Sequence, residues 1–170
     1  MILAAKQRVA EHAEKKRQAE AEWVAHNYPK AAGPAGGVLT EQLVTGHAVA
    51  GEGPMRVRYR GSEIRYVGDV LGRDGPPLTV ISFGSGEGGA PIFTDQPAVF
   101  TVERGQTKIN TGLDSAIAAM ASGERRVVIV PASLGYGRAG LYTPEVPGKR
   151  RLVISPNAML VYEVEVLGND

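Results

Sequence analysis

The residues with the clearest chemical potential in this sequence are large apolar and aromatic side chains at strand ends and in loops. Side chains of this kind could line an apolar pocket, but they also form ordinary protein cores. The set comprises Tyr59, Phe100, Leu113, Tyr136, Ile154 and Tyr162. Their residue types alone leave both interpretations open.

Other kinds of catalytic chemistry find little support. The three histidines, His12, His26 and His47, are scattered, and no carboxylate spacing resembles a set of metal ligands. The absence of cysteine excludes disulfides, thiolate metal sites and cysteine nucleophiles. No serine lies on the strand-to-helix turn that a Ser-His-Asp hydrolase needs. We therefore expect neither a metal ion nor another cofactor.

Anionic ligands are also poorly matched by the sequence. The run GSGEGG at residues 84–89 resembles a phosphate-binding loop, but no Lys-Ser or Lys-Thr follows it and no helix begins there. The basic clusters at residues 15–17 and 149–151 are small, and 19 Lys and Arg nearly balance 18 Asp and Glu. We expect these clusters to be solvated and no nucleic acid to bind.

Length and composition predict one soluble domain with extensions, because 170 residues at 43% hydrophobic content suffice for a core. No stretch approaches the roughly 18 apolar residues of a membrane span. The first 23 residues carry Glu11, Glu14, Glu20 and Glu22, unlike a transit or signal peptide. If the protein is imported, we expect its targeting segment to be missing here.

Residues 1–28 are rich in Ala, Glu, Lys and Gln, which predicts a charged helical extension. Its apolar positions, Ile2, Ala5, Val9 and Trp23, form only a thin stripe. A solvated helix is favoured over a partner-docking helix. Residues 29–53 then read as a glycine- and proline-rich linker with a short first strand at residues 38–44.

Alternating apolar and polar residues predict strands at residues 55–60, 99–103, 126–130 and 160–167. One amphipathic helix lies among them, with Thr111 as its N-cap and its end near Gly123. A short helix must bury its apolar face against a sheet, so we predict the α+β class: a curved antiparallel β-sheet, or half-barrel, wrapped around one short α-helix. The glycine- and proline-rich residues 72–97 and 141–152 are predicted to be long loops.

Several motifs in the order GLD, M, GERR, VP and LGYG, followed by PNAMLVYEVEVL, closely resemble the FK506-binding protein (FKBP) family of peptidyl-prolyl cis/trans isomerases. The upstream segment RVRYRG is similar to the family strand that ends in a tyrosine and a glycine. The resemblance covers residues 54–170 and leaves the N-terminal helix outside. In that family the substrate proline enters an apolar pocket between the short helix and the curved sheet.

Carried over by position, the resemblance implies two sets of site residues. The tyrosine matching Tyr136 donates a hydrogen bond to a ligand carbonyl, the backbone N–H of Asn110 is the expected second donor, and Leu113 stands where the family often has a tryptophan. The implied catalytic residues are Tyr59, Asp69, Phe100, Tyr136 and Tyr162. The implied substrate-binding residues are Ile109, Asn110, Leu113, Val153 and Ile154.

One departure from the family pattern bears on activity. Members normally carry a Phe-Asp pair about ten residues after the first tyrosine, whereas EIRYVGDVLG offers only Gly68 and Asp69 and no phenylalanine. The leading hypothesis is an isomerase of Xaa-Pro bonds that assists protein folding or complex assembly, with reduced activity. The alternative is a weakly active or inactive binding module that docks a protein complex through the long loops and the N-terminal helix.

The stretch LGYGRAGLYTPEVPGKRRLVISPN is also similar to divergent FKBPs of the plastid thylakoid lumen. This second resemblance implies a photosynthetic source and a lumenal location, with the cytoplasm as the alternative.

Overall fold

The computed structural model describes residues 2–34, 37–47, 53–68, 77–104, 106, 109–146 and 149–167. Its main element is a seven-stranded antiparallel sheet in the order β1-β6-β9-β2-β3-β4, with β5 also paired to β2. The strands are β1 (Leu39–Val44), β2 (Pro54–Tyr66), β3 (Leu78–Ser85), β4 (Pro91–Ile92), β5 (Phe100–Glu103), β6 (Arg125–Val130) and β9 (Met159–Leu167). A separate hairpin pairs β7 (Leu141–Val146) with β8 (Lys149–Ile154). The helices are α1 (Ile2–Asn27) and α2 (Thr111–Ala118), with short 3-10 turns η1 (Glu87–Gly89) and η2 (Ala132–Leu134).

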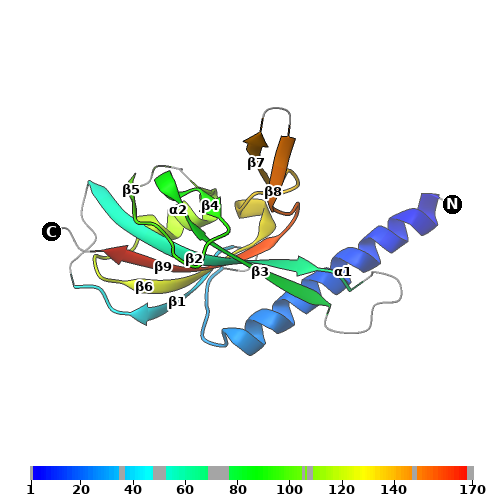
Figure 1. Ribbon diagram of the computed structural model, residues 1–170. Helices are drawn as coiled ribbons and strands as arrows, with labels where there is room; N and C mark the ends of the chain where they lie inside the picture. Colours follow the sequence, from blue (N-terminus) through cyan, green and yellow to red (C-terminus); the bar gives the residue numbers. More distant parts are fainter. Residues whose placement is uncertain are drawn as a thin grey trace.

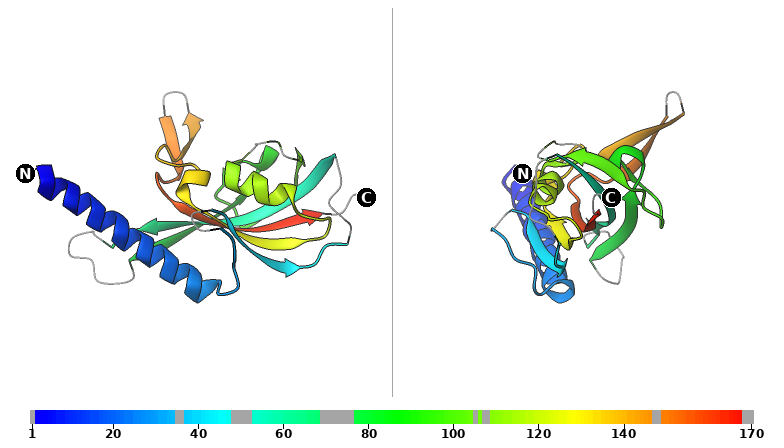
Figure 2. Two further views of the ribbon diagram at one scale, coloured as in Figure 1. Left: turned by 180° about the vertical axis from the view of Figure 1, so that it is seen from behind. Right: turned by 90° about the vertical axis from the view of Figure 1, so that its left-hand side faces the viewer.

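The alternation in the sequence accounts for the two faces of the sheet. On β2, Met55, Val57 and Tyr59 are buried on the concave face, while the arginines between them are exposed on the other face. The central strands β2 and β9 pair with Tyr59 opposite Val164, so both strands place their apolar residues on one side. This confirms the predicted curved antiparallel sheet, which bends around α2 (Figure 2).

Helix α2 closes the concave side. Leu113 and Ile117 are 0% and 3% exposed and belong to the main core cluster. Its N-cap is Asn110, whose side-chain oxygen accepts a hydrogen bond of 2.8 Å from the Leu113 N–H, so the predicted cap at Thr111 is wrong by one residue. The helix also ends earlier than predicted, at Ala118. Gly123, with a φ of 84°, lies in the turn that leads into β6.

Helix α1 crosses the opposite, outer face of the sheet (Figures 1 and 2). Trp23, Val24 and Tyr28 pack against a second apolar cluster on that face. The cluster consists of Ile64, Val127, Ile129, Met159 and Val161. The prediction of a solvated extension is therefore wrong for the C-terminal part of α1, which covers apolar surface that the strands leave on their outer side. The first half is exposed, with Leu3 at 79% and Val9 at 70%.

Both segments predicted as long loops contain strands. The first holds β3 and β4; β3 extends the sheet by pairing with the second half of β2, from Arg60 opposite Gly84 to Tyr66 opposite Leu78. The second forms the β7–β8 hairpin, which stands off the body of the molecule (Figure 1). Glycines and prolines dominated the prediction, but an edge strand and an isolated hairpin tolerate them. Among the described residues, no helix has the combination of length and apolar character that a membrane span needs.

Candidate active site

The side chains predicted to form a pocket meet on the concave face, between the sheet and α2. Ile109 and Tyr136 are partly buried and pack against this group, so they mark its solvent-facing side. The buried members are Tyr59, Phe100, Leu113, Val153, Ile154 and Tyr162. Strands β2, β5, β8 and β9 and helix α2 thus each contribute to one apolar wall.

Tyr59 is the centre of the aromatic part of the wall. Its ring makes edge-to-face contacts with Phe83, Phe100 and Tyr162, at centroid distances of 6.3, 5.9 and 5.2 Å. Phe83 and Tyr162 also contact each other, at 5.7 Å. Edge-to-face pairs stabilise beyond the burial of their area, so four rings hold one another in fixed orientations.

Phe83 is the site residue that the sequence reasoning missed. It lies opposite Gly61 on β2, and a Cβ at Gly61 would come within 2.4 Å of the Phe83 ring. The segment EIRYVGDVLG contains no phenylalanine, but β3 brings Phe83 beside Tyr59, and the next residue is Gly84. The β-branched residues before it, in the run LTVISF, indicate a strand. The family's spacing of about ten residues after the tyrosine instead directed attention to Gly68, fifteen residues before Phe83.

The Tyr59 hydroxyl makes an internal bond. It donates to the Gly89 carbonyl at 2.6 Å, in a buried setting. Gly89 has a φ of 90°, and a Cβ there would come within 2.8 Å of Phe100. Ser85 adds a second tie, since its hydroxyl donates to the Ala98 carbonyl at 2.7 Å and accepts from the Tyr59 N–H at 3.2 Å. These bonds hold the segment after β3 against the aromatic wall.

Polar groups gather at the start of α2. Asn110 is 5% exposed, and its side-chain N–H donates to the Tyr162 hydroxyl at 2.9 Å. Asp114, 7% exposed, accepts from the Ile109 N–H at 3.4 Å. The predicted role of Asn110 as a backbone donor to substrate stays a prediction, and the structure adds these side-chain bonds.

A buried carboxylate, that of Glu63, holds the end of β8 that carries the site residues Val153 and Ile154. Ser155 follows Val153 and Ile154, and its N–H donates to Glu63 Oε1 at 3.0 Å. Glu63 is 0% exposed and also pairs with Arg65 at 3.2 Å. This contact fixes the end of β8 next to β2. Asp69, the remaining predicted catalytic residue, lies outside the described residues.

Burial changes the acidity of the three phenols. Burial raises the pKa of Tyr136 to about 12; a hydrogen bond from Asn110 acts in the opposite direction, and the charge of Asp114 adds to the increase. Burial also raises the pKa of Tyr59 and Tyr162, in both cases with a smaller contribution from Tyr136. All three hydroxyls are therefore protonated at neutral pH, and act as hydrogen-bond donors rather than as bases.

This protonation state predicts how the protein responds to pH. Catalysis should be flat between about pH 6 and pH 9, because no phenol of the site titrates there. The folded pKa of Tyr136 lies above its unfolded value of 10.0, so its contribution to stability is fully present below pH 10.0 and is lost as the pH rises to about 12. Urea unfolding and rate measurements across this range test both statements. A rate inflection near pH 7 would contradict the first.

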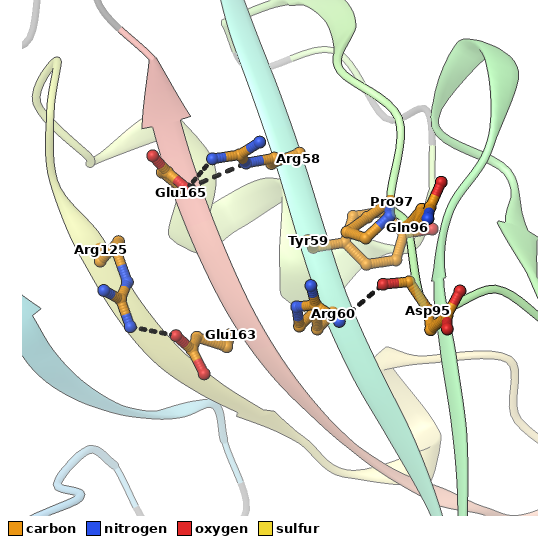
Figure 3. Close-up of a pocket in the computed structure, with 9 residues that line it drawn as sticks. All are labelled: Arg58, Tyr59, Arg60, Asp95, Gln96, Pro97, Arg125, Glu163 and Glu165. Carbon is orange, nitrogen blue, oxygen red and sulfur yellow. Dashed lines mark hydrogen bonds and ion pairs between the residues drawn. The ribbon is translucent and has the colours of Figure 1, made fainter.

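A polar cleft on the outer face of the sheet is a separate feature (Figure 3). Arg58 pairs with Glu165 at 3.0 Å, and Arg125 pairs with Glu163. Arg60 donates to the Asp95 carbonyl at 3.0 Å. Glu165 and Glu163 thus offset the charges of Arg58 and Arg125, whereas Arg60 contacts a backbone carbonyl. Within the described ranges, no three histidines or acids are grouped as they would be around a metal ion.

Comparison with known proteins finds matches that include most of these site residues. Residues 82–167 match the family model described as FKBP-type peptidyl-prolyl cis-trans isomerase. Human peptidyl-prolyl cis-trans isomerase FKBP2 is 38% identical over 73 residues, covering 43% of this chain and 44% of that protein. Peptidyl-prolyl cis-trans isomerase FPR2 of Saccharomyces cerevisiae is 40% identical over 65 residues, covering 38% of this chain and 42% of that protein. The match thus spans less than half the length of these curated relatives.

Two solved structures share the fold. A peptidyl-prolyl cis-trans isomerase from Pseudomonas syringae superposes with a TM-score of 0.54 at 21% identity, covering 91% of this chain and 90% of that one. FkpA from Escherichia coli gives a TM-score of 0.55 at 17% identity, covering 96% of this chain and 61% of that one. At these identities the likeness supports the α+β fold alone.

Proposed function

This chain belongs to the FKBP-type peptidyl-prolyl cis-trans isomerase family, and on that premise we propose that it isomerises Xaa-Pro bonds in proline-containing polypeptides. The observation that carries the proposal is the aromatic wall of Tyr59, Phe83, Phe100 and Tyr162 on the concave face, beside the partly exposed Tyr136. The family match covers β4, β5, β6, β9 and α2 and thereby most of this wall.

The chemistry needs neither a nucleophile nor a metal. Rotation about a peptide bond faces a barrier of about 18–20 kcal/mol because twisting removes the amide resonance. An apolar surface disfavours the charge-separated planar amide, and a fixed donor favours the twisted form. Tyr136 supplies a protonated hydroxyl at the edge of the apolar wall. We therefore assign Tyr136 as the principal donor to substrate.

The absence of a Phe-Asp pair from this chain, in which Phe83 is followed by Gly84, affects the rate rather than the existence of the site. In this chain the Tyr59 hydroxyl donates to the Gly89 carbonyl, so Tyr59 is oriented without a neighbouring acid. The aromatic wall is complete because Phe83 is present. We expect catalysis to persist at a reduced rate.

A refolding experiment tests the proposal with a polypeptide substrate. A model protein whose refolding is limited by one trans-to-cis prolyl isomerisation should refold faster as this protein is added, in proportion to its concentration. The spontaneous slow phase provides the baseline. An unchanged slow phase at a molar excess of this protein would contradict the proposed activity.

A binding or assembly function is the second candidate, and specific exposed residues favour it. Tyr142 and Leu152 are opposite each other on the β7–β8 hairpin and are 46% and 37% exposed. The first half of α1 exposes Leu3 and Val9. Exposed apolar side chains on projecting elements are typical of surfaces that contact other proteins. Under this second hypothesis, the β7–β8 hairpin and α1 bind a partner protein, and the concave face contributes little catalysis.

The hairpin separates the two functions experimentally. Replacing both Tyr142 and Leu152 with serine should leave the kcat/KM for a short Xaa-Pro peptide unchanged but lower it about threefold or more for a refolding protein, because only a long chain reaches the hairpin. Val80→Ser, at a 49% exposed position on β3, is the matched control and should change neither rate. Equal losses with peptide and protein would show that the hairpin acts on the pocket instead.

A thylakoid-lumen location stays a prediction from the likeness of residues 134–157 to plastid members. The curated relatives described above, from human and yeast, give it no support. Imaging the full-length protein in its source cells decides between the lumen and the cytoplasm.

A further inference from the structure

Strand β3 leaves part of its backbone unpaired within the described part of the chain. On one side it pairs with β2 along its length, from Leu78 opposite Tyr66 to Gly84 opposite Arg60. On its other side, β4 pairs only with Gly84 and Ser85. The preceding residues therefore lie at an open margin of the sheet, beside the second half of β2 (Figure 1). Residues 78–82 are called the β3 margin below.

The hydrogen-bond pattern shows which backbone groups of the β3 margin face outward. Along an antiparallel pair, successive residues bond alternately toward the partner strand and away from it. The Val67 N–H donates to the Pro77 carbonyl at 2.7 Å in the register of the β2–β3 pair, so odd-numbered residues bond toward β2. On the side of β4, it is Gly86 whose N–H donates to the Ala90 carbonyl, also at 2.7 Å. Even-numbered residues thus face outward, and in the β3 margin these are Leu78, Val80 and Ser82.

The sequence of the β3 margin lacks the features that usually protect an edge strand. Natural proteins place charges, prolines, bulges or covering segments at sheet edges to prevent pairing with other chains. Residues 78–83 read LTVISF, without a charge or a proline, and Val80 is 49% exposed. The opposite edge strand, β1, is protected: Thr40 forms a bridge with Ala32, and Glu41 adds a charge. The β3 margin is therefore the edge that favours the addition of a strand.

The chemistry of the β3 margin selects an extended polypeptide as its ligand. Outward N–H and C=O groups in alternation are complementary to the backbone of another extended chain, with little dependence on its side chains. The next residue, Phe83, belongs to the aromatic wall through its contact with Tyr59. Val80 lies three residues before Phe83, which is about 10 Å along a strand. A polypeptide whose proline lies at the wall therefore reaches the β3 margin with the residues that flank the proline.

We propose that the β3 margin binds the segment of a substrate polypeptide next to its proline, as an additional strand of the sheet. This inference rests on the proposed isomerase function and deepens it, because it specifies the class of substrate. The favoured substrates are unfolded chains whose proline-flanking residues readily adopt a β conformation. Their recognition depends on backbone hydrogen bonds, so it differs from the side-chain contacts of the β7–β8 hairpin.

Amide hydrogen exchange measured by NMR tests the binding step without catalysis. The probe is a peptide with the segment Thr-Val-Thr-Val-Thr between terminal lysines, and its control is the same peptide N-methylated throughout that segment. At millimolar concentration the probe should slow exchange of the Val80 amide about tenfold, and the control should have no effect. The amides of Thr79 and Ile81, which face β2, serve as the internal reference. Exchange at Val80 that is unchanged by the probe, or slowed equally by the control, would overturn the inference.

A second experiment connects the β3 margin with the substrate. An Xaa-Pro peptide is extended by the same Thr-Val segment, before the proline in one peptide and after it in another. At least one of them should show a kcat/KM about fivefold above that of the short peptide, as a few weak backbone hydrogen bonds imply. Val80→Pro removes the outward N–H and should abolish this gain, whereas Val80→Ser keeps the N–H and should retain it. An equal gain in the two variants, or no gain in the unmodified protein, would overturn the inference.

The two experiments also separate failure of this inference from failure of the proposed function. If no peptide is isomerised, the proposed function fails, while the exchange experiment still decides whether the β3 margin binds a strand. If Val80→Pro does not fold, as judged by circular dichroism, the N-methylated extension replaces it, because it removes the same hydrogen bonds from the peptide side. Protection of Val80 that rises with protein concentration in the absence of peptide would assign the β3 margin to a second copy of this chain and overturn the inference.

Discussion

Replacing Phe83 with alanine is expected to lower the free energy of unfolding by about 3–5 kcal/mol, the usual cost of removing a buried aromatic ring. Phe83 is 2% exposed and contacts both Tyr59 and Tyr162 edge to face. Its removal leaves a cavity within the aromatic wall and frees Tyr59 to move. Urea denaturation followed by far-UV circular dichroism measures the change, and the isomerisation rate should fall with it.

Phe93 provides a matched control for this substitution. Phe93 directly follows β4, ten residues after Phe83, but it is 43% exposed, and the Arg151 guanidinium lies 4.8 Å from its ring centroid. Phe93→Ala should cost less than about 1 kcal/mol, since exposed cation–π contacts are weak. Similar losses for the two substitutions would contradict the placement of Phe83 in the core.

Tyr136→Ala is expected to lower kcat/KM for a short Xaa-Pro peptide by about a hundredfold. The substitution removes the donor hydroxyl together with part of the apolar wall, whereas Tyr136→Phe removes the hydroxyl alone and should cost about tenfold. A protease-coupled or protease-free peptide assay measures both. The tyrosine at position 142 is the control, because it lies on the hairpin at 46% exposure and its replacement by alanine should leave this rate unchanged.

Comparing the two Tyr136 variants separates the two contributions of the side chain. If Tyr136→Phe retained full activity while Tyr136→Ala lost it, the ring would matter and the hydroxyl would not. Equal losses in the two variants would instead assign the whole effect to the hydroxyl.

The sequence predicted the central part of the fold well. Strict alternation on β2 is sufficient to place Met55, Val57 and Tyr59 on the buried face, because residues two apart share a face of a strand. The stripe containing Leu113 and Ile117 likewise predicted a helix packed against the sheet. These local periodicities are strong, and the apolar faces they predict pack against one another in the core.

The features that the sequence did not predict depend on contacts between residues far apart in the chain. Phe83 belongs to the site only because β3 pairs with the extended end of β2, a register that no local pattern specifies. Trp23 docks on the sheet because β6 and β9 leave apolar residues on their outer face. The hydrogen bond from the Asn110 amide to the Tyr162 hydroxyl likewise joins residues fifty-two positions apart in the chain.

Glycine content was the main source of error in the first predicted loop, residues 72–97. The run at residues 84–89 suggested an open loop, but Gly84 lies in β3 and Gly89 accepts the bond from Tyr59. In both places the missing Cβ allows a close approach, to Thr94 in one case and Phe100 in the other. Here glycine reflects tight packing rather than freedom.

The central claim is that the concave face of this chain catalyses prolyl isomerisation, and exchange NMR on a peptide tests it most directly. A short peptide with one Xaa-Pro bond gives separate cis and trans signals whose uncatalysed exchange takes tens of seconds or longer. Substoichiometric protein should produce exchange cross-peaks between these signals, and Tyr136→Ala should nearly abolish them. Exchange that stayed at the buffer rate with the unmodified protein, or that persisted unchanged with Tyr136→Ala, would contradict the assignment of activity to this site.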